Sequence, residues 1–271
     1  LEFLNIVSKP SNVLNKLTII EGWSKKDLNI ELAKYFSDFN SIEYDEILAD
    51  TYYFNNNEDF SKFIKRIKSF KDEFLIKNKD NKFFLKYNEK ELLIIGSLIE
   101  KEGLGELDKL KISSVISNRL EKKMKLQIDA TVIYALTNGL FDLNRNLKFK
   151  DYKFEHPYNT YMINGLPPGP ISSPGLGSIS AALNPKKTNY LYFVANGKGG
   201  HYFSSSYSEH LKNIKLWRKN KILKNKKNIF IENIMYKHSK IFLKLKNYWK
   251  KNKKNILKIE INFLIPNFFK I

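Results

Sequence analysis

Two glutamates at the end of a short apolar segment have the residue type and spacing for acid–base chemistry. The segment Lys90–Glu102 has helical periodicity and ends in Glu100 and Glu102. With Leu92 set at zero, Glu102 falls at about 280°, on the apolar face, and Glu100 at about 80°, on a side with small residues. A carboxyl on an apolar face loses hydration, which raises its pKa and suits it to general-acid catalysis. We therefore expect Glu102 to be the acid, the alternative being a surface residue at a frayed helix end. Gly103 is expected to end the helix and leave open space around the carboxyl.

The composition excludes several other chemistries. The 271 residues contain no Cys, which rules out thiol nucleophiles, disulfides and Cys-ligated metals. His156, His201, His210 and His238 do not have metal-ligand spacing, so we expect no metal and no cofactor. The net charge is +19, yet only four basic residues are Arg, which disfavours a nucleic-acid partner.

The elements that must position these residues suggest an α+β fold in three parts. Residues 1–85 have mixed character, with a strand expected at Leu17–Glu21 and helices at Ser24–Phe36 and Phe60–Phe74. Residues 86–217 contain every candidate for chemistry. Their expected elements are helices at Lys90–Glu102 and Glu106–Lys123, a rigid loop at Leu166–Gly177, and an aromatic strand at Tyr190–Val194 that turns at Asn196-Gly197 toward Phe203. Residues 218–271 form a Lys/Asn-rich extension that carries +14 of the charge.

Short motifs follow one another across about residues 90–210 of the sequence. They are SLIEKE at 97–102, NRL at 118–120, MKLQID at 124–129, TVIY at 131–134, YNTY at 158–161, GLPPGPI at 165–171, PG at 174–175, YLYFV at 190–194 and GKGGH at 197–201. In these motifs and their order the chain resembles the YceG-like family, the membrane-anchored endolytic murein transglycosylases. Weaker matches at 21–22 and 50–52 extend the resemblance toward residue 15.

The resemblance implies an enzyme that cleaves peptidoglycan glycan strands internally. Its one catalytic residue would be Glu102, which would protonate the oxygen between N-acetylmuramic acid and N-acetylglucosamine, assisted by the acetamido group of the substrate. The carboxylate would then deprotonate the muramic C6 hydroxyl, giving a 1,6-anhydro end. The family architecture also implies a catalytic domain with helices and a small antiparallel sheet, preceded by a LysM-like remnant within residues 1–85.

Around this acid we expect donors and groove walls that contact the sugars. Each of these residues has a purely structural role as its alternative. The candidates are Asn118, Gln127, Asp129, Asn159, Tyr161, Pro167, Pro168, Gly169 and His201. Tyr190, Tyr192 and Phe193 are expected first in the core, and as stacking platforms only if they line the groove.

Two other functions remain open at this stage. One is a muramidase that uses water with Asp129 as second carboxylate. The other is a non-catalytic protein that binds cell wall or polyanions through its basic tail. The resemblance further implies a monomer in the periplasm, held to the bacterial inner membrane by a single span outside this chain. Peptidoglycan synthases are possible partners, and the basic tail is expected to be weakly attracted to an anionic membrane surface.

Overall fold

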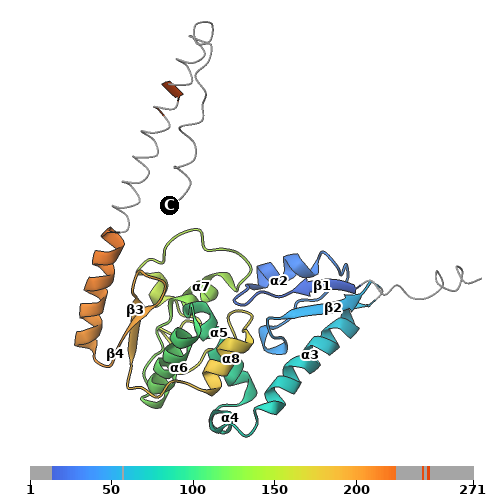
Figure 1. The fold of residues 1–271 in the computed structure, drawn as a ribbon, viewed down its shortest axis with the longest axis horizontal. Helices are drawn as coiled ribbons and strands as arrows, with labels where there is room; N and C mark the ends of the chain where they lie inside the picture. Colours follow the sequence, from blue (N-terminus) through green and yellow to red (C-terminus); the bar gives the residue numbers. More distant parts are fainter. Residues whose placement is uncertain (1–13, 57, 224–239, 241–242, 245–271) are drawn as a thin grey trace, which may run out of the picture. The chain divides into compact units, whose positions relative to one another are not determined.

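The computed structural model describes residues 14–56, 58–223, 240 and 243–244 (Figure 1). The chain divides into two compact units, residues 1–217 and 218–271. The first unit contains helices and two small antiparallel sheets, so the α+β prediction is confirmed. Of the second unit, residues 218–223 are helical, whereas most of the predicted basic extension lies outside the described residues. No helix in the described part of the chain is long and apolar enough to span a bilayer.

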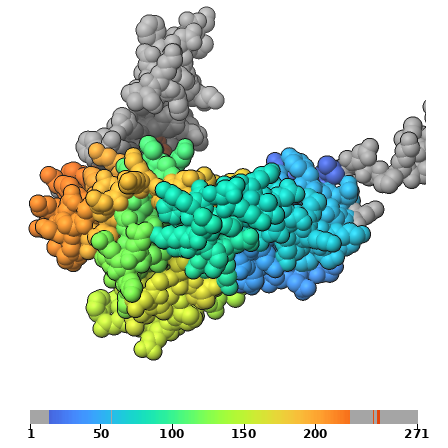
Figure 2. All heavy atoms as spheres, turned by 90° about the horizontal axis from the view of Figure 1, so that it is seen from below, coloured from blue at the N-terminus to red at the C-terminus, as the bar shows by residue number. Residues whose placement is uncertain are grey.

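The first sheet pairs strand β1 (Leu14–Thr18) with β2 (Thr51–Asn55), and helix α2 (Lys25–Leu32) lies between them in sequence. Ser24 caps α2 in a reciprocal capping box with Asp27, which fixes where the helix begins. The strand predicted at Leu17–Glu21 therefore begins and ends earlier. Helix α3 (Phe60–Lys77) buries Phe63 and Ile67 against this sheet region. In Figure 2 residues 14–56, in blue, form one continuous surface with the teal helices that follow them.

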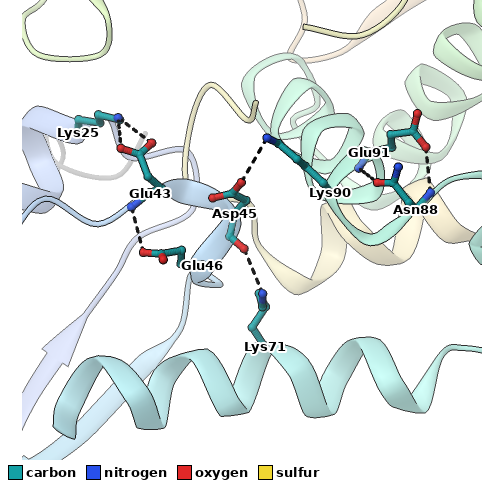
Figure 3. A network of polar contacts seen from close by, with 8 residues as sticks. All are labelled: Lys25, Glu43, Asp45, Glu46, Lys71, Asn88, Lys90 and Glu91. Atoms are coloured by element: carbon teal, nitrogen blue, oxygen red, sulfur yellow. Dashed lines mark hydrogen bonds and ion pairs between the residues drawn. The ribbon is translucent and has the colours of Figure 1, made fainter. Parts of the chain in front are cut away.

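A polar network joins this region to the rest of the unit through the short helix η1 (Tyr44–Glu46) (Figure 3). Lys71 of α3 donates to the backbone oxygen of Asp45 at 3.1 Å, and Lys90 lies 3.9 Å from the Asp45 carboxylate. The neighbouring Glu43 accepts from Lys25 of α2 at 2.8 Å. Three helices therefore converge on one turn, and the hydrophobic core runs through both sides of it.

Helix α5 (Glu89–Glu102) lies at the centre of the core. It is buried on every side from Leu92 to Ile99, which hides its small-residue face as well as its apolar one. Gly96 permits a close approach of helix α8 (Leu176–Leu183), since a Cβ there would lie 3.0 Å from Ile179. The Ser97 hydroxyl accepts from the backbone N–H of Ile171 at 3.1 Å. Helix α5 is thus held by packing against α8 and by a hydrogen bond from the Pro-rich loop that precedes α8.

Five further elements belong to the same unit as α5, and most expected boundaries shift by a few residues. Helix α6 (Glu106–Glu121) follows α5 directly, as predicted. Helix α7 (Asp129–Thr137) and α8 were not predicted as helices, and the expected loop at Leu166–Gly177 leads into α8. The remaining short elements are α4 (Lys82–Lys86) and η2 (Asp151–Lys153).

The second sheet is the hairpin of β3 (Tyr192–Ala195) and β4 (His201–Ser204). Its pairing places Ala195 opposite His201, with Gly197 and Gly199 in the left-handed region that lets the chain reverse. A helix begins at residue 207, directly after the hairpin. The expected aromatic strand and turn are confirmed in kind, with the strand beginning two residues later than predicted.

Candidate active site

Glu102 lies in a cavity of about 600 Å³. It is the last residue of α5, and the N-terminus of α7 faces it, with the Ala130 backbone N–H hydrogen-bonded to its carboxyl. The cavity wall consists of residues from the α5 end, α6, the segment 126–129, the hairpin and the helix after it. Its lining is Glu102, Arg119, Leu126, Gln127, Ile128, Asp129, Tyr161, Tyr192, Phe193, Val194, Ala195, His201, Tyr207, His210, Ile214 and Trp217.

The surroundings of Glu102 favour its protonated form. Burial raises the pKa of Glu102 to about 7, and the negative charge of Asp129 adds to the rise. Lys101 and the Ala130 N–H lower this pKa by smaller amounts. A carboxyl with a pKa near 7 donates a proton and takes one back at neutral pH, which is what an acid–base group requires.

Glu100 has the opposite setting. Its side chain is 7% exposed and accepts from Lys109 Nζ at 2.8 Å and from Ser178 Oγ at 2.5 Å. The backbone N–H of Gly175 adds a third contact at 3.3 Å. These partners satisfy the charge inside the protein. Glu100 therefore joins α5, α6 and α8, and it does not line the cavity.

Gly103 ends α5 as predicted, and the Glu102 carboxyl faces the cavity, but the space next to Gly103 itself is filled. A Cβ at Gly103 would lie 2.5 Å from Lys109 Cγ and 3.3 Å from Lys109 Cα. The first turn of α6 fills this space. The backbone of Gly103 is ordinary, with φ −89°, so the close approach of Lys109 is what requires glycine here.

Asp129 stands at the first position of α7 and is held by two phenols. Tyr161 donates to Oδ1 at 2.6 Å, and Tyr152 donates to Oδ2 at 3.4 Å. Their rings pack against each other with centroids 4.7 Å apart. Gln127, two residues earlier, lines the same cavity from a left-handed backbone conformation with φ 53°.

His201 is fixed from the side of the α5–α6 turn. Asp108, in the first turn of α6, accepts from Nδ1 of His201 at 2.8 Å and from its backbone N–H at 3.3 Å. A carboxylate only accepts, so Nδ1 carries a proton in this contact. The His201 side chain is 10% exposed, with the ring edge-on to Phe193. These two hydrogen bonds therefore join the hairpin to the first turn of α6, which follows Glu102 closely in sequence.

Arg119 and an aromatic stack build the opposite part of the wall. The Arg119 guanidinium donates to the carbonyl oxygens of Leu191 and Leu126, at 2.6 and 2.8 Å, and lies 5.1 Å from the Tyr192 ring centroid. His210 stacks on the same ring with centroids 5.1 Å apart. Burial lowers the pKa of His210, and the charge of Arg119 lowers it further. Tyr192 and Phe193 do line the cavity, the condition that we set for a stacking role.

The predicted site residues fall into two groups. Gln127, Asp129, Tyr161 and His201 line the cavity with Glu102. The others do not line it. Among these, Asn118 donates to the carbonyl oxygens of Thr188 and Tyr190, each at 2.9 Å, and Asn159 to those of Tyr152 and Phe154.

The expected groove wall in the Pro-rich loop is likewise absent from this cavity. Pro167 is buried and Pro168 is exposed, and neither lines the cavity. Gly169 packs under Tyr158, whose hydroxyl would lie 2.7 Å from an added Cβ. We interpret this loop as support for α5 and the aromatic cluster of Tyr158.

Sequence reasoning missed Asp108, Tyr207, His210 and Trp217. The signal that was present is the helical spacing of Tyr207, His210, Ile214 and Trp217, which places one face of that helix toward the hairpin. Asp108 gave no such signal, since its partner is 93 residues away in sequence.

An α+β unit with a protonatable glutamate in an aromatic-lined cavity has the site of an acid–base enzyme. The chain belongs to the YceG-like family, whose model matches residues 1–216. It is similar to the endolytic murein transglycosylase of Bacillus subtilis, with 41% identity over 167 residues, covering 60% of this chain and 44% of that protein. It is also similar to the endolytic murein transglycosylase of Streptococcus pneumoniae serotype 2, with 38% identity over 128 residues, 46% of this chain and 23% of that one.

The fold has a solved counterpart. The crystal structure of a YceG-like protein from Listeria monocytogenes matches with a TM-score of 0.64 and 31% identity, covering 77% of this chain and 78% of that one. The chain spans less than half the length of the curated relatives that it matches.

Proposed function

We propose that this protein is an endolytic transglycosylase that cleaves peptidoglycan glycan strands between N-acetylmuramic acid and N-acetylglucosamine. The observation that carries the proposal is Glu102, whose pKa of about 7 combines with a position in an aromatic-lined cavity. The names of the two curated relatives support the same activity. Sugars stack on aromatic rings, and the cavity offers Tyr192 and Tyr207 for this purpose.

In this proposal Glu102 acts twice in one turnover. Its proton goes to the bridging oxygen, so that the bond from C1 of the muramic sugar to that oxygen breaks. The resulting carboxylate then takes the proton of the C6 hydroxyl, whose oxygen bonds to C1 and gives the 1,6-anhydro end. No water is consumed. His201 and Gln127, which line the cavity, would contact hydroxyl and amide groups of the sugars.

A hydrolytic muramidase is the second candidate, and Asp129 is the observation that favours it. Asp129 is a second carboxylate in the cavity, close enough for its charge to raise the pKa of Glu102. A retaining or inverting hydrolase needs such a partner. We favour the transglycosylase because both curated relatives carry that name.

Cleavage of purified glycan strands in ¹⁸O-labelled water separates the two candidates. We expect muropeptides that end in 1,6-anhydromuramic acid and contain no solvent oxygen at C1, measured by mass spectrometry. Reducing ends that carry the label would establish hydrolysis in place of transglycosylation.

The place of action follows from the substrate in this proposal. Peptidoglycan lies outside the cytoplasmic membrane, so the enzyme would act in the cell envelope. A single-pass inner-membrane anchor, a monomeric state and association with peptidoglycan synthases remain predictions from the family resemblance.

A further inference from the structure

We propose that Asp129 is a catalytic residue that stabilises the positive charge developing on the substrate acetamido group during cleavage. The inference rests on the proposed transglycosylase function, and it gives Asp129 a role other than the base of a hydrolase. It also gives Tyr161 and Tyr152 a role as positioning residues that orient this carboxylate.

The geometry places a fixed negative charge beside the acid. Asp129 and Glu102 line one cavity, and Asp129 occupies the helix end whose next residue contacts the Glu102 carboxyl. Tyr161, at 2.6 Å, and Tyr152, at 3.4 Å, bind different oxygens of Asp129. Both partners are neutral phenols, so they fix the orientation of the carboxylate without cancelling its charge.

The position of Tyr161 is itself enforced by buried contacts. The Asn159 side-chain oxygen accepts from the Tyr161 backbone N–H at 3.0 Å, and Asn159 is fully buried. The Thr160 hydroxyl contacts that of Thr131 at 2.8 Å, which ties this segment to α7. The phenol and the carboxylate therefore belong to one rigid assembly, as a preorganised electrostatic group requires.

The reaction creates a charge that such a carboxylate would stabilise. When Glu102 protonates the bridging oxygen, the bond from that oxygen to C1 breaks. The acetamido carbonyl oxygen bonds to C1 in its place, and the resulting five-membered ring carries the positive charge over its carbon and N–H. An anion that accepts from this N–H stabilises the cation most strongly in the transition state. The C6 oxygen then displaces the acetamido oxygen from C1, and its proton returns to Glu102.

The charge balance of the cavity is consistent with this role. The other titratable and charged groups of the cavity are Arg119, Asp129, Tyr161, Tyr192, His201, Tyr207 and His210, and Lys101 precedes the acid in α5. Asp129 raises the pKa of Glu102, so one carboxylate both keeps the acid protonated and offers an anion to the cationic intermediate.

The test compares Asp129→Asn with the wild-type chain by two measurements. One is turnover of purified glycan strands. The other is the affinity, by calorimetry, for the thiazoline of N-acetylmuramic acid, a stable analogue of the cyclic intermediate. We expect kcat to fall about 100-fold, KM to change less than about threefold, and the thiazoline to bind about 100-fold more weakly.

Binding of an uncleaved strand to Glu102→Gln and to Glu102→Gln/Asp129→Asn should differ by less than about threefold. Asp72→Asn, on the exposed side of α3, is the matched control and should leave all values unchanged.

Tyr161→Phe keeps the ring and removes the donor, so it tests the positioning role even if Asp129→Asn fails to fold. It should weaken thiazoline binding about tenfold and leave strand binding unchanged. Equal weakening of the thiazoline and of the uncleaved strand would overturn the inference, because Asp129 would then bind sugar in the ground state only. That result leaves the proposed function intact, whereas ¹⁸O in the wild-type product would overturn the proposed function itself.

Discussion

The last turn of α5 holds two carboxyls in contrasting surroundings. Glu100 is surrounded by α6 and α8 and is neutralised by Lys109, with further donors from Ser178 and Gly175. Glu102, two residues further on, faces a cavity in which the nearest described carboxylate, Asp129, repels its charge. Burial alone therefore does not make a carboxyl an acid. Among the described residues Glu102 has no ion pair like that of Glu100, and this separates a group that gives up its proton near pH 7 from one that stabilises the fold.

The comparison predicts the largest effect for the loss of the Glu102 proton. Glu102→Gln should reduce strand cleavage by at least about 1,000-fold, because an amide neither donates the proton nor takes it back. Glu100→Gln should stay within about tenfold of the wild-type rate. Release of soluble muropeptides, followed by chromatography, measures both. Equal losses of cleavage rate in the two variants, both folded, would contradict the assignment of Glu102 as the acid and Glu100 as a structural residue.

The reverse ranking is expected for stability. Glu100→Gln leaves the buried Lys109 with only the half-exposed Glu21 carboxylate, 3.7 Å away, whereas Glu102→Gln replaces a partly buried carboxyl with a neutral group. We expect Glu100→Gln to lower the free energy of unfolding by about 2 kcal/mol at pH 7. Urea denaturation followed by circular dichroism checks this value. Unchanged stability would mean that the ion pair with Lys109 contributes little, since an amide oxygen still accepts from Ser178 and Gly175.

The effect of Glu102 on stability depends on pH. The pKa of Glu102 is raised from an ordinary value of 4.5 to about 7 in the folded state, so the protonated form favours folding. This contribution is complete below pH 4.5 and is lost as the pH rises through about 7. Glu102→Gln should therefore match the wild type near pH 4 and exceed its stability at pH 8 by up to about 3 kcal/mol. A constant difference between the two pH values would contradict the raised pKa.

The elements that could be predicted are those with long periodic faces. Helices α3, α5 and α6 fall within a few residues of their expected ranges because each is long and apolar on its core side. Helices α7 and α8 and strand β2 are short and lack a polar–apolar period, so nothing in the local pattern marked them. Their structure depends on what packs against them.

The features of the site that depend on local sequence could be predicted, whereas the contacts between segments far apart in the sequence could not. The helical angles placed Glu100 beside two small residues. They could not show that Gly96 allows α8 to pack closely or that Ser97 accepts a hydrogen bond from the loop at Ile171. In the sequence, small residues give a helix face little apolar character. In the fold, the same face lets neighbouring segments pack closely. The pairing of Asp108 with His201 spans 93 residues and depends on tertiary contacts that no local period encodes.

The cavity is lined by segments that are far apart in the sequence, which determines when the site forms during folding. Its residues come from Glu102, Arg119, 126–129, Tyr161, 192–201 and 207–217, so the cavity closes only when segments about a hundred residues apart have met. Contacts of such long range form late in folding, since each must offset the entropy of closing a large loop. Until then Glu102 stays hydrated, with a pKa near 4.5, and is ionised at neutral pH. A nascent or partly folded chain would therefore lack a usable acid, and activity would appear only on completion of the fold.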